Sequence, residues 1–370
     1  METRTSRRYF MLGTAAALGQ VALLRRVTAT TLAPGATVPT VDSLKITVLI
    51  DSSHDIFMRA EGPKVLRIKR TPAVADYRKT LHNVWGLSLG LESKRGAETR
   101  QILLDFGYTP QTLLENMEML GFDLAKADSM VLSHGHFDHW GGLFGMLQKH
   151  RGAMRPDITL YAGGEDNFCQ RLRGTGTPGR FSEWGMLDRR ELAAQRVNLV
   201  LCEKPTAIAG HAFTTGAIRR TSIEKVLPGP RVEYAMKAGA GCNMSHFTDK
   251  EMLGKPVHDE HIHEHATCFN IKDRGLVVIN SCGHAGILNS IRQAMEVSGV
   301  KKLHALVGGF HLAPAKPDYL QQVVLELKAM DPEVVIPMHC SGLNFVQEVQ
   351  RQMPDRLALS TTGSEFTLGA

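Results

Sequence analysis

The chain has 370 residues, of which 43% are hydrophobic and 22% are charged, the balance of an ordinary globular protein. Its formal net charge is +6, and residues 1–33 hold +4 of this, as five arginines against one glutamate. The remaining excess is small and no basic stripe is interleaved with aromatic residues, so the composition does not predict nucleic-acid binding. After the first few dozen residues no apolar stretch is long enough to cross a bilayer, and we expect the mature protein to be soluble.

Residues 1–33 have the organisation of an export signal. The pair Arg7 and Arg8 precedes an aromatic residue, and a moderately apolar segment follows at residues 11–24. This order resembles a twin-arginine signal peptide, and the apolar part is too short for a membrane span. We therefore expect the twin-arginine machinery to export the protein to the periplasm, with cleavage within residues 29–36. An uncleaved leader that anchors the chain to the membrane is the alternative.

Residues 42–370 are predicted to form the main domain, and its first half reads as strands followed by helices. Gly121 ends the first expected helix. The strand at residues 127–133 is short and apolar, and it leads directly into a cluster of histidines. The expected strands are Lys45–Ile50, Trp85–Glu92, Gln101–Asp105 and Ala127–Ser133, and the expected helices are Pro110–Met119 and Gly141–His150.

Residues 165–260 are rich in glycine, proline, arginine and polar residues, and they are predicted to be a long insertion near the mouth of the active site. The last third of the chain alternates strands with helices. Such alternation indicates an α/β layered fold with functional sites at the carboxyl ends of strands. The expected strands are Leu276–Asn280, Leu303–Val307 and Val334–Pro337, and the helices that follow them are Gly286–Val297, Asp318–Met330 and Leu343–Met353.

Six cysteines are scattered through the sequence without short paired spacing. This distribution does not predict a disulfide framework or a zinc knuckle, although it leaves one or two disulfides open. The cysteines are Cys169, Cys202, Cys242, Cys268, Cys282 and Cys340.

Four potential metal ligands follow the strand at residues 127–133 within six positions. His134 and His136 are two apart in extended chain, so their side chains can face one metal ion. Asp138 and His139 come just past the turn and can face a second ion. Imidazole and carboxylate ligands without a thiolate suit zinc, with manganese or iron as the alternatives.

This run resembles the His-x-His-x-Asp-His signature of the metallo-β-lactamase superfamily, and Asp105 resembles its earlier strand-end aspartate, which supports the histidine loop. The resemblance implies an αββα sandwich with a two-metal site at strand ends. A further set of motifs resembles the branch of the family named for dihydropterin ribofuranosylaminobenzene-phosphate synthase. These motifs are Gly86-Leu87-Ser88, Leu104-Asp105-Phe106-Gly107, Ser281-Cys282-Gly283-His284-Ala285-Gly286-Ile287, Gly308-Gly309-Phe310-His311-Leu312 and His339-Cys340-Ser341-Gly342.

The resemblance implies further ligands late in the chain. His339 matches the final histidine of the superfamily and is expected to bind the second metal. His284 is expected to be the remaining ligand, with Cys282 and His265 as rivals. His311 is expected to contact substrate or phosphate. The run from His258 to His265 holds four histidines among three acids, and we expect it to be a solvated loop, since polar runs in long insertions usually face solvent.

Together these features predict an exported two-metal enzyme, with zinc as its metal, that acts on a small molecule. A water bridging the two ions would be activated as hydroxide to cleave a small ester or phosphoester, with Asp138 orienting it. A transferase or synthase of the dihydropterin type and a non-catalytic binding protein on the same fold are the alternatives.

Overall fold

The computed structural model describes residues 30–369, apart from residues 71–75, 77, 238, 251 and 253–255. The predicted export signal lies, up to residue 29, outside the described residues. Within the described part of the chain, no helix is both long and apolar enough to span a membrane.

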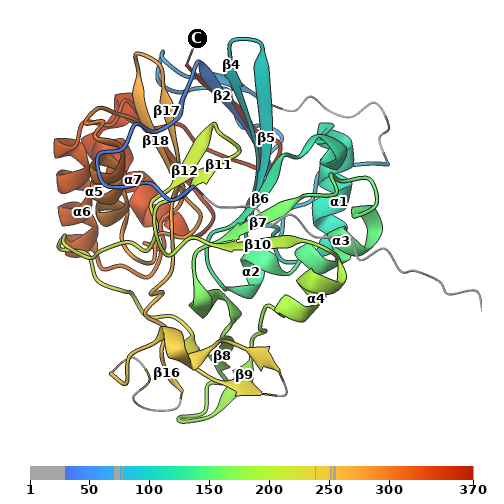
Figure 1. Cartoon of the computed structure of the whole chain (residues 1–370). Coiled ribbons are helices and arrows are strands. Elements are labelled where there is room, and N and C mark those ends of the chain that lie inside the picture. Colours follow the sequence, from blue (N-terminus) through green and yellow to red (C-terminus); the bar gives the residue numbers. More distant parts are fainter. Residues whose placement is uncertain are drawn as a thin grey trace, which may run out of the picture.

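Two large β-sheets form the centre of the molecule (Figure 1). The first has eight strands in the order β10 (Asn198–Leu201), β7 (Thr159–Ala162), β6 (Ser129–Leu132), β5 (Glu98–Leu104), β4 (Ser88–Arg95), β2 (Ser43–Ile50), β21 (Glu365–Gly369) and β3 (Arg67–Lys69). The second has seven, in the order β11 (Ala207–Ile208), β12 (Ala212–Thr214), β17 (Thr267–Ile271), β18 (Gly275–Asn280), β19 (Leu303–Gly309) and β20 (Val334–Met338), with β1 (Thr40–Val41) paired to β17.

Helices cover the outer face of each sheet, so that the layers run helix, sheet, sheet, helix (Figure 1). Beside the eight-stranded sheet lie α1 (Pro110–Leu120), α3 (Leu143–His150) and α4 (Arg189–Ala194), and beside the other lie α5 (Ile287–Ser298), α6 (Pro317–Ala329) and α7 (Leu343–Gln352). The predicted αββα sandwich is confirmed. Most of the helix and strand bounds predicted from the sequence agree with the structure to within about three residues.

Three apolar cores hold these layers together. The inner core lies between the sheets and includes Ile46, Leu104, Val277 and Ile336. Each sheet also packs against its own helices, through two further sets of buried aliphatic and aromatic residues. The strands β18, β19 and β20 are buried along their whole length, which explains why their sequences are almost continuously apolar.

The strand predicted at Trp85–Glu92 begins later than expected, at Ser88. Gly86 has a φ of +131°, and a side chain there would collide with the carbonyl oxygen of Asp138. The chain therefore turns at Gly86 and passes close to the predicted metal-binding segment. Trp85 projects from this turn with 50% of its surface exposed.

Only part of the interval 165–260 forms a separate unit. A small four-stranded sheet consists of β16 (Val257–His258), β13 (Arg231–Glu233), β8 (Gln170–Gly174) and β9 (Phe181–Glu183), and it extends from one end of the sandwich (Figure 1). A two-stranded ribbon joins β14 (Met236–Lys237) to β15 (Ala240–Gly241). Residues 198–214 instead supply β10, β11 and β12 to the two main sheets. These strands have four residues or fewer, too short for the periodicity of the sequence to reveal them.

Candidate metal centre

The functional candidates converge because the strands that carry them end at one edge of the sandwich. The strands β5, β6 and β7 run parallel, as do β18, β19 and β20, so their carboxyl ends meet. His134 and His136 follow β6, and Asp138 and His139 lie on the single turn α2 (Phe137–Trp140). From the other sheet, Cys282 and His284 follow β18, His311 follows β19, and His339 follows β20.

A first group of imidazoles surrounds His136. Its ring centroid lies 4.6 Å from that of His134, 4.8 Å from that of His284 and 4.7 Å from that of His261. One ligand atom each of His136, His261 and His284 lies within 4.8 Å of the others. The structure thus brings together three of the predicted ligands, and it adds His261, which the sequence did not single out.

A second group lies beside the first and includes the carboxylate. Asp138 Oδ2 is 3.4 Å from His339 Nε2 and 3.8 Å from His139 Nε2. Cys282 Sγ lies 3.5 Å from His139 Nε2 and could be a further ligand of a metal ion bound by this group. Two neighbouring groups of this kind are the arrangement expected of a two-metal site.

Hydrogen bonds to Nδ1 orient three of the histidines, so that their Nε2 atoms face the site. His139 Nδ1 lies 2.6 Å from Asp105 Oδ2, and His339 Nδ1 lies 2.9 Å from Ser52 Oγ. His134 Nδ1 lies 2.9 Å from the Ser133 hydroxyl, which also lies 2.7 Å from Asp105. A carboxylate or hydroxyl on one ring nitrogen is the usual support of a histidine that binds metal through the other.

A bound cation would pair with the polar atoms of the site that make no hydrogen bond. Several buried nitrogen and oxygen atoms have no hydrogen-bond partner among the described residues, and such atoms cost free energy unless something else pairs with them. They are His134 Nε2, His136 Nε2, His284 Nε2, His339 Nε2 and Asp138 Oδ1. Imidazole nitrogens and a carboxylate oxygen converging in a buried site fit a divalent cation of the zinc type.

Electrostatics hold two of the imidazoles neutral and the carboxylate ionised, as metal coordination requires. Burial lowers the pKa of His134 and of His284 well below the ordinary value, and neighbouring imidazoles lower it further. Burial alone would raise the pKa of Asp138, but His139 and His339 bring it below its usual range. His339 differs: burial alone would lower its pKa, but Cys340 and Asp138 raise that pKa to about 10, so this imidazole must release a proton when it binds metal.

The backbone is strained where it delivers these side chains. Among the described residues, eight that are not glycine have a positive φ, and four of them belong to the site: Asp105, His261, His311 and His339, with φ between +46° and +56°. Such conformations cost about 1 kcal/mol or more each and gather at functional positions. Gly308 allows the strand end before His311 to approach β18, because a Cβ there would lie 1.7 Å from the carbonyl oxygen of Asn280.

The run from His258 to His265 is not a solvated loop, and that expectation was wrong. His261 and His265 are each 2% exposed, and Asp259 is 1% exposed. The segment connects β16, a strand of the small sheet, to β17 of the seven-stranded sheet. His265 Nε2 lies 2.8 Å from the carbonyl oxygen of Leu132, so this histidine is engaged with the backbone and does not join the groups described above.

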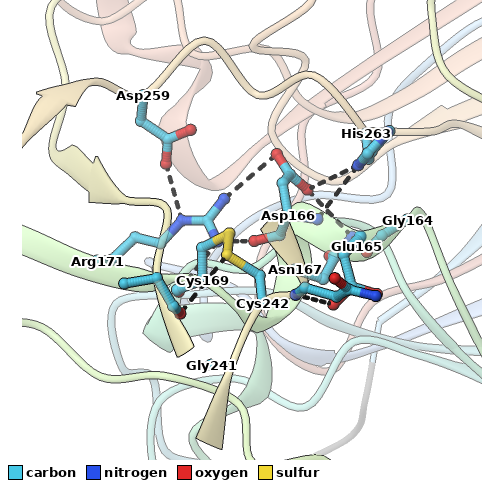
Figure 2. The surroundings of a disulfide bond; sticks show 12 residues. Gly164, Glu165, Asp166, Asn167, Cys169, Arg171, Gly241, Cys242, Asp259 and His263 are labelled. Carbon is cyan, nitrogen blue, oxygen red and sulfur yellow. Dashed lines mark hydrogen bonds and ion pairs between the residues drawn. A yellow bond between two sulfur atoms is a disulfide. The ribbon is translucent and has the colours of Figure 1, made fainter. Parts of the chain in front are cut away.

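A buried ion-pair network ties the small sheet to the metal centre (Figure 2). Arg171, on β8, has no exposed surface; its Nε donates to Asp259 Oδ2 over 2.9 Å, and it also pairs with Asp166. Asp259 Oδ2 in turn lies 3.4 Å from His136 Nε2. The disulfide Cys169–Cys242 lies directly beside this network, as Figure 2 shows, and joins segments 73 residues apart.

A cavity of about 520 Å³ opens onto the centre. Its floor includes His136, Asp138, His311 and His339, together with Cys282 and Cys340. Its walls include the indoles of Trp85 and Trp184 and the guanidinium of Arg173, which lies 4.2 Å above the Trp184 ring. Arg173 and Trp184 belong to the small sheet region, so this sheet supplies one wall of the cavity.

Comparison with known proteins agrees with this geometry. Residues 96–222, which include the whole His-x-His-x-Asp-His run, match the model of the metallo-beta-lactamase superfamily. The chain carries a metallo-β-lactamase superfamily domain. A crystallised metal-dependent hydrolase of the β-lactamase superfamily has the same fold, with a TM-score of 0.61 and 22% identity over 87% of this chain and 98% of that one.

Two curated proteins of Methanocaldococcus jannaschii resemble the chain in sequence. One is 7,8-dihydropterin-6-methyl-4-(beta-D-ribofuranosyl)-aminobenzene-5'-phosphate synthase, which is 25% identical over 75% of this chain and 89% of its own length. The other is an uncharacterized protein, 25% identical over 68% of this chain and 83% of its own length. The recognition of this superfamily, and of a likeness to this synthase, is therefore confirmed.

The structure brings the predicted ligands to one site, and these are His134, His136, Asp138, His139, His284 and His339. Asp105 supports His139, and His311 lies at the edge of the site with its ring 4.1 Å from that of His284. Of the rivals for the last position, Cys282 lies in the site and His265 does not. His261, Cys340, Asp259 and Arg171 were missed. The signal that the sequence offered for these residues was the acidic and histidine-rich composition of residues 258–265, which is compatible with metal ligands.

Proposed function

We propose that the chain is a two-metal hydrolase, with zinc as its cation, that cleaves a small ester or phosphoester. The observation that carries this proposal is the set of buried Nε2 atoms of His134, His136, His284 and His339, which make no hydrogen bond to the described residues and converge on two neighbouring positions beside an open cavity. When bound there, two divalent cations would lower the pKa of water and polarise the oxygen of the scissile bond.

The residues around the cavity have distinct roles in this proposal. Asp138 lies in the second group, and its Oδ1 makes no hydrogen bond to the described residues, so that oxygen can accept a hydrogen bond from the attacking water and orient it. Arg173 supplies a positive charge for an anionic substituent of the substrate. The indoles of Trp85 and Trp184 offer flat apolar surfaces for a ring or an acyl chain.

A synthase or transferase is the second candidate, because the chain resembles the dihydropterin ribofuranosylaminobenzene-phosphate synthase over 89% of that protein's length. The same wall residues are compatible with it, since a pterin is a flat ring and that product carries a phosphate. The two candidates differ in their co-substrate. A hydrolase consumes water, whereas a synthase joins two organic molecules and releases a leaving group.

One experiment separates the candidates. Purified protein reconstituted with zinc, and in parallel with manganese or iron, is assayed against esters, lactones and phosphodiesters. It is also assayed against a dihydropterin together with ribofuranosylaminobenzene 5'-phosphate, the two parts of the product that the relative's name gives. Hydrolysis that disappears on chelation and returns with metal supports the first proposal. Product formation only from the paired dihydropterin substrates would overturn it in favour of the synthase.

We also propose that the protein is exported to the periplasm by the twin-arginine machinery. Support comes from the leader around Arg7 and Arg8 and from the disulfide Cys169–Cys242, since disulfides persist in oxidising compartments. The test is the location of the variant in which both arginines become lysine. Retention of the precursor in the cytoplasm is expected, and an unchanged periplasmic yield would contradict the proposal. Recovery of the wild-type protein with the membrane fraction would favour the uncleaved anchor.

A further inference from the structure

Two free cysteines and a histidine meet beside the proposed two-metal centre. Cys282 Sγ lies 3.1 Å from Cys340 Sγ, and the ligand atoms of these two residues and of His311 all lie within 4.8 Å of one another. Of the other four cysteines, two form the disulfide, and Cys202 and Cys268 are buried separately. The pair therefore brings together thiols from two strand ends 58 residues apart.

Neither ring nitrogen of His311 forms a hydrogen bond with the residues that the structure describes. Both Nδ1 and Nε2 are buried and unpaired, although the backbone N–H of His311 donates to Cys340 Sγ over 3.2 Å. His311 also has a φ of +46°, an unfavourable conformation for a residue with a side chain. The fold thus accepts strain to hold an unsatisfied imidazole against two thiols, and this combination suggests a ligand at that position.

We propose that Cys282, Cys340 and His311 form a separate binding site for a thiophilic cation such as Zn²⁺, Cd²⁺ or Cu⁺, beside the two positions of the main centre. Two thiolates and one imidazole are the donor set that such cations prefer. A tetrahedral cation with Zn–S bonds near 2.3 Å holds two sulfurs about 3.8 Å apart. The two Sγ atoms would need to separate by less than an ångström, which small rotations of the side chains provide.

The site is open to ions from solution, because Cys282, Cys340 and His311 all line the 520 Å³ cavity. The two sulfurs would bind the cation as thiolates, since only thiolates coordinate strongly. A cation there would lie at the part of the cavity that His311 lines. Thiophilic ions would then compete with any substrate group that contacts His311.

The test is a titration of the metal-free protein with Cd²⁺, followed by ultraviolet thiolate-to-cadmium charge-transfer absorption and by calorimetric stoichiometry. The wild-type protein is expected to bind three cations, and Cys340→Ser and His311→Ala are expected to bind two. In each variant the affinity for the third cation should fall by at least roughly 10- to 100-fold, the loss typical of removing even an outer-shell partner of a metal. Cys268→Ser and His304→Gln are matched controls, since both alter buried residues outside the site, and they should bind three.

Two outcomes would overturn the proposal. In one, Cys340→Ser and His311→Ala bind as many cations as the wild type, while Cys282→Ser alone loses the absorption. Cys282 would then serve the main centre together with His139 and His339. In the other, thiol counting on the untreated wild type finds only two free thiols, so that Cys282 and Cys340 form a disulfide.

A measurement on the unmodified protein guards against variants that do not fold. Cys282 and Cys340 line the cavity, whereas Cys202 and Cys268 do not. A small maleimide should therefore label the first two in the metal-free protein, and a saturating amount of Cd²⁺ should protect both. Equal labelling of Cys340 with and without Cd²⁺ would contradict the site even if every variant misfolded.

Discussion

The imidazole rings of His261 and His284 are stacked, with centroids 3.7 Å apart and an angle of 7° between their planes. His261 precedes β17 and His284 follows β18, so the stack joins the two ends of an antiparallel strand pair. Both rings belong to the same potential ligand group as His136. The first metal position therefore has a fourth candidate in His261, besides the three that the sequence indicated.

This stack predicts different results for His261 and His265, two histidines four positions apart. His261→Ala should lower bound metal and activity, because it removes a side chain from the ligand group. His265→Ala should keep the metal and lose about 1–3 kcal/mol of unfolding free energy, because it leaves the buried Leu132 carbonyl oxygen unpaired. Metal content and denaturant unfolding of both variants test this. Metal loss in His265→Ala with none in His261→Ala would reverse the assignment.

Asp105 is expected to act by positioning His139. Its carboxylate accepts from the Ser133 N–H and hydroxyl and lies 2.6 Å from His139 Nδ1. Asp105→Asn should therefore weaken metal binding by about 10- to 100-fold while the six candidate ligands remain in place. Competition with a metallochromic chelator measures the affinity. An unchanged affinity combined with a lower melting temperature would mean that Asp105 has only a structural role.

The disulfide is expected to stabilise the small sheet and the network around Arg171. Closing a loop of 73 residues contributes about 4 kcal/mol in the chain-entropy model. A reductant should lower the melting temperature of the wild type, whereas the double variant Cys169→Ala, Cys242→Ala should start lower and not respond. A reductant effect of equal size in both proteins would show that the other cysteines are responsible.

A pH dependence of stability is expected at Glu224, whose carboxylate accepts from the Ile287 and Leu288 N–H groups at the start of α5. Burial raises the pKa of Glu224 to about 7, although these hydrogen bonds oppose the rise. A folded pKa above the unfolded value means that the stabilising contribution is complete below about pH 4.5 and is lost as the pH rises to 7.

The comparison for Glu224 is with Glu224→Gln, which keeps an acceptor and cannot ionise. Between pH 4.5 and 7.5 the unfolding free energy of the variant should increase relative to that of the wild type, because the wild type loses the contribution of the protonated carboxyl group. Chemical denaturation of the two proteins at several pH values in this interval provides the measurement. A difference that stays constant with pH would indicate that the carboxylate remains ionised in the folded protein.

Much of the fold could be predicted because it depends on local pattern. The apolar strands β18, β19 and β20 alternate with amphipathic helices, and Gly121 ends α1 in the left-handed conformation. The strands β11 and β12 escaped notice, because two or three residues carry no periodicity. β12 is placed by its pairing with β17, which lies more than fifty residues further along the chain, and β11 is placed by its pairing with β12.

The residues of the centre could be predicted where they are close in sequence or directly follow a predicted strand. His134, His136, Asp138 and His139 lie within six positions, and His339 directly follows an apolar strand. The burial of His261 could not be predicted, because it depends on the ion pair between Arg171 and Asp259, 88 positions apart. The polar composition of residues 258–265 suggested a solvent-exposed loop. The ion pair that accompanies the burial of this segment forms only when the chain is folded.

The central claim is that converging imidazoles hold two metal ions. The measurement that tests it most directly is the zinc content per chain after extensive dialysis, determined in the Cys340→Ser background so that the proposed thiolate site does not contribute. The account predicts two zinc ions per chain in this background, and one or none when His136→Ala is added. Fewer than two in the first protein, or two in both, would contradict it.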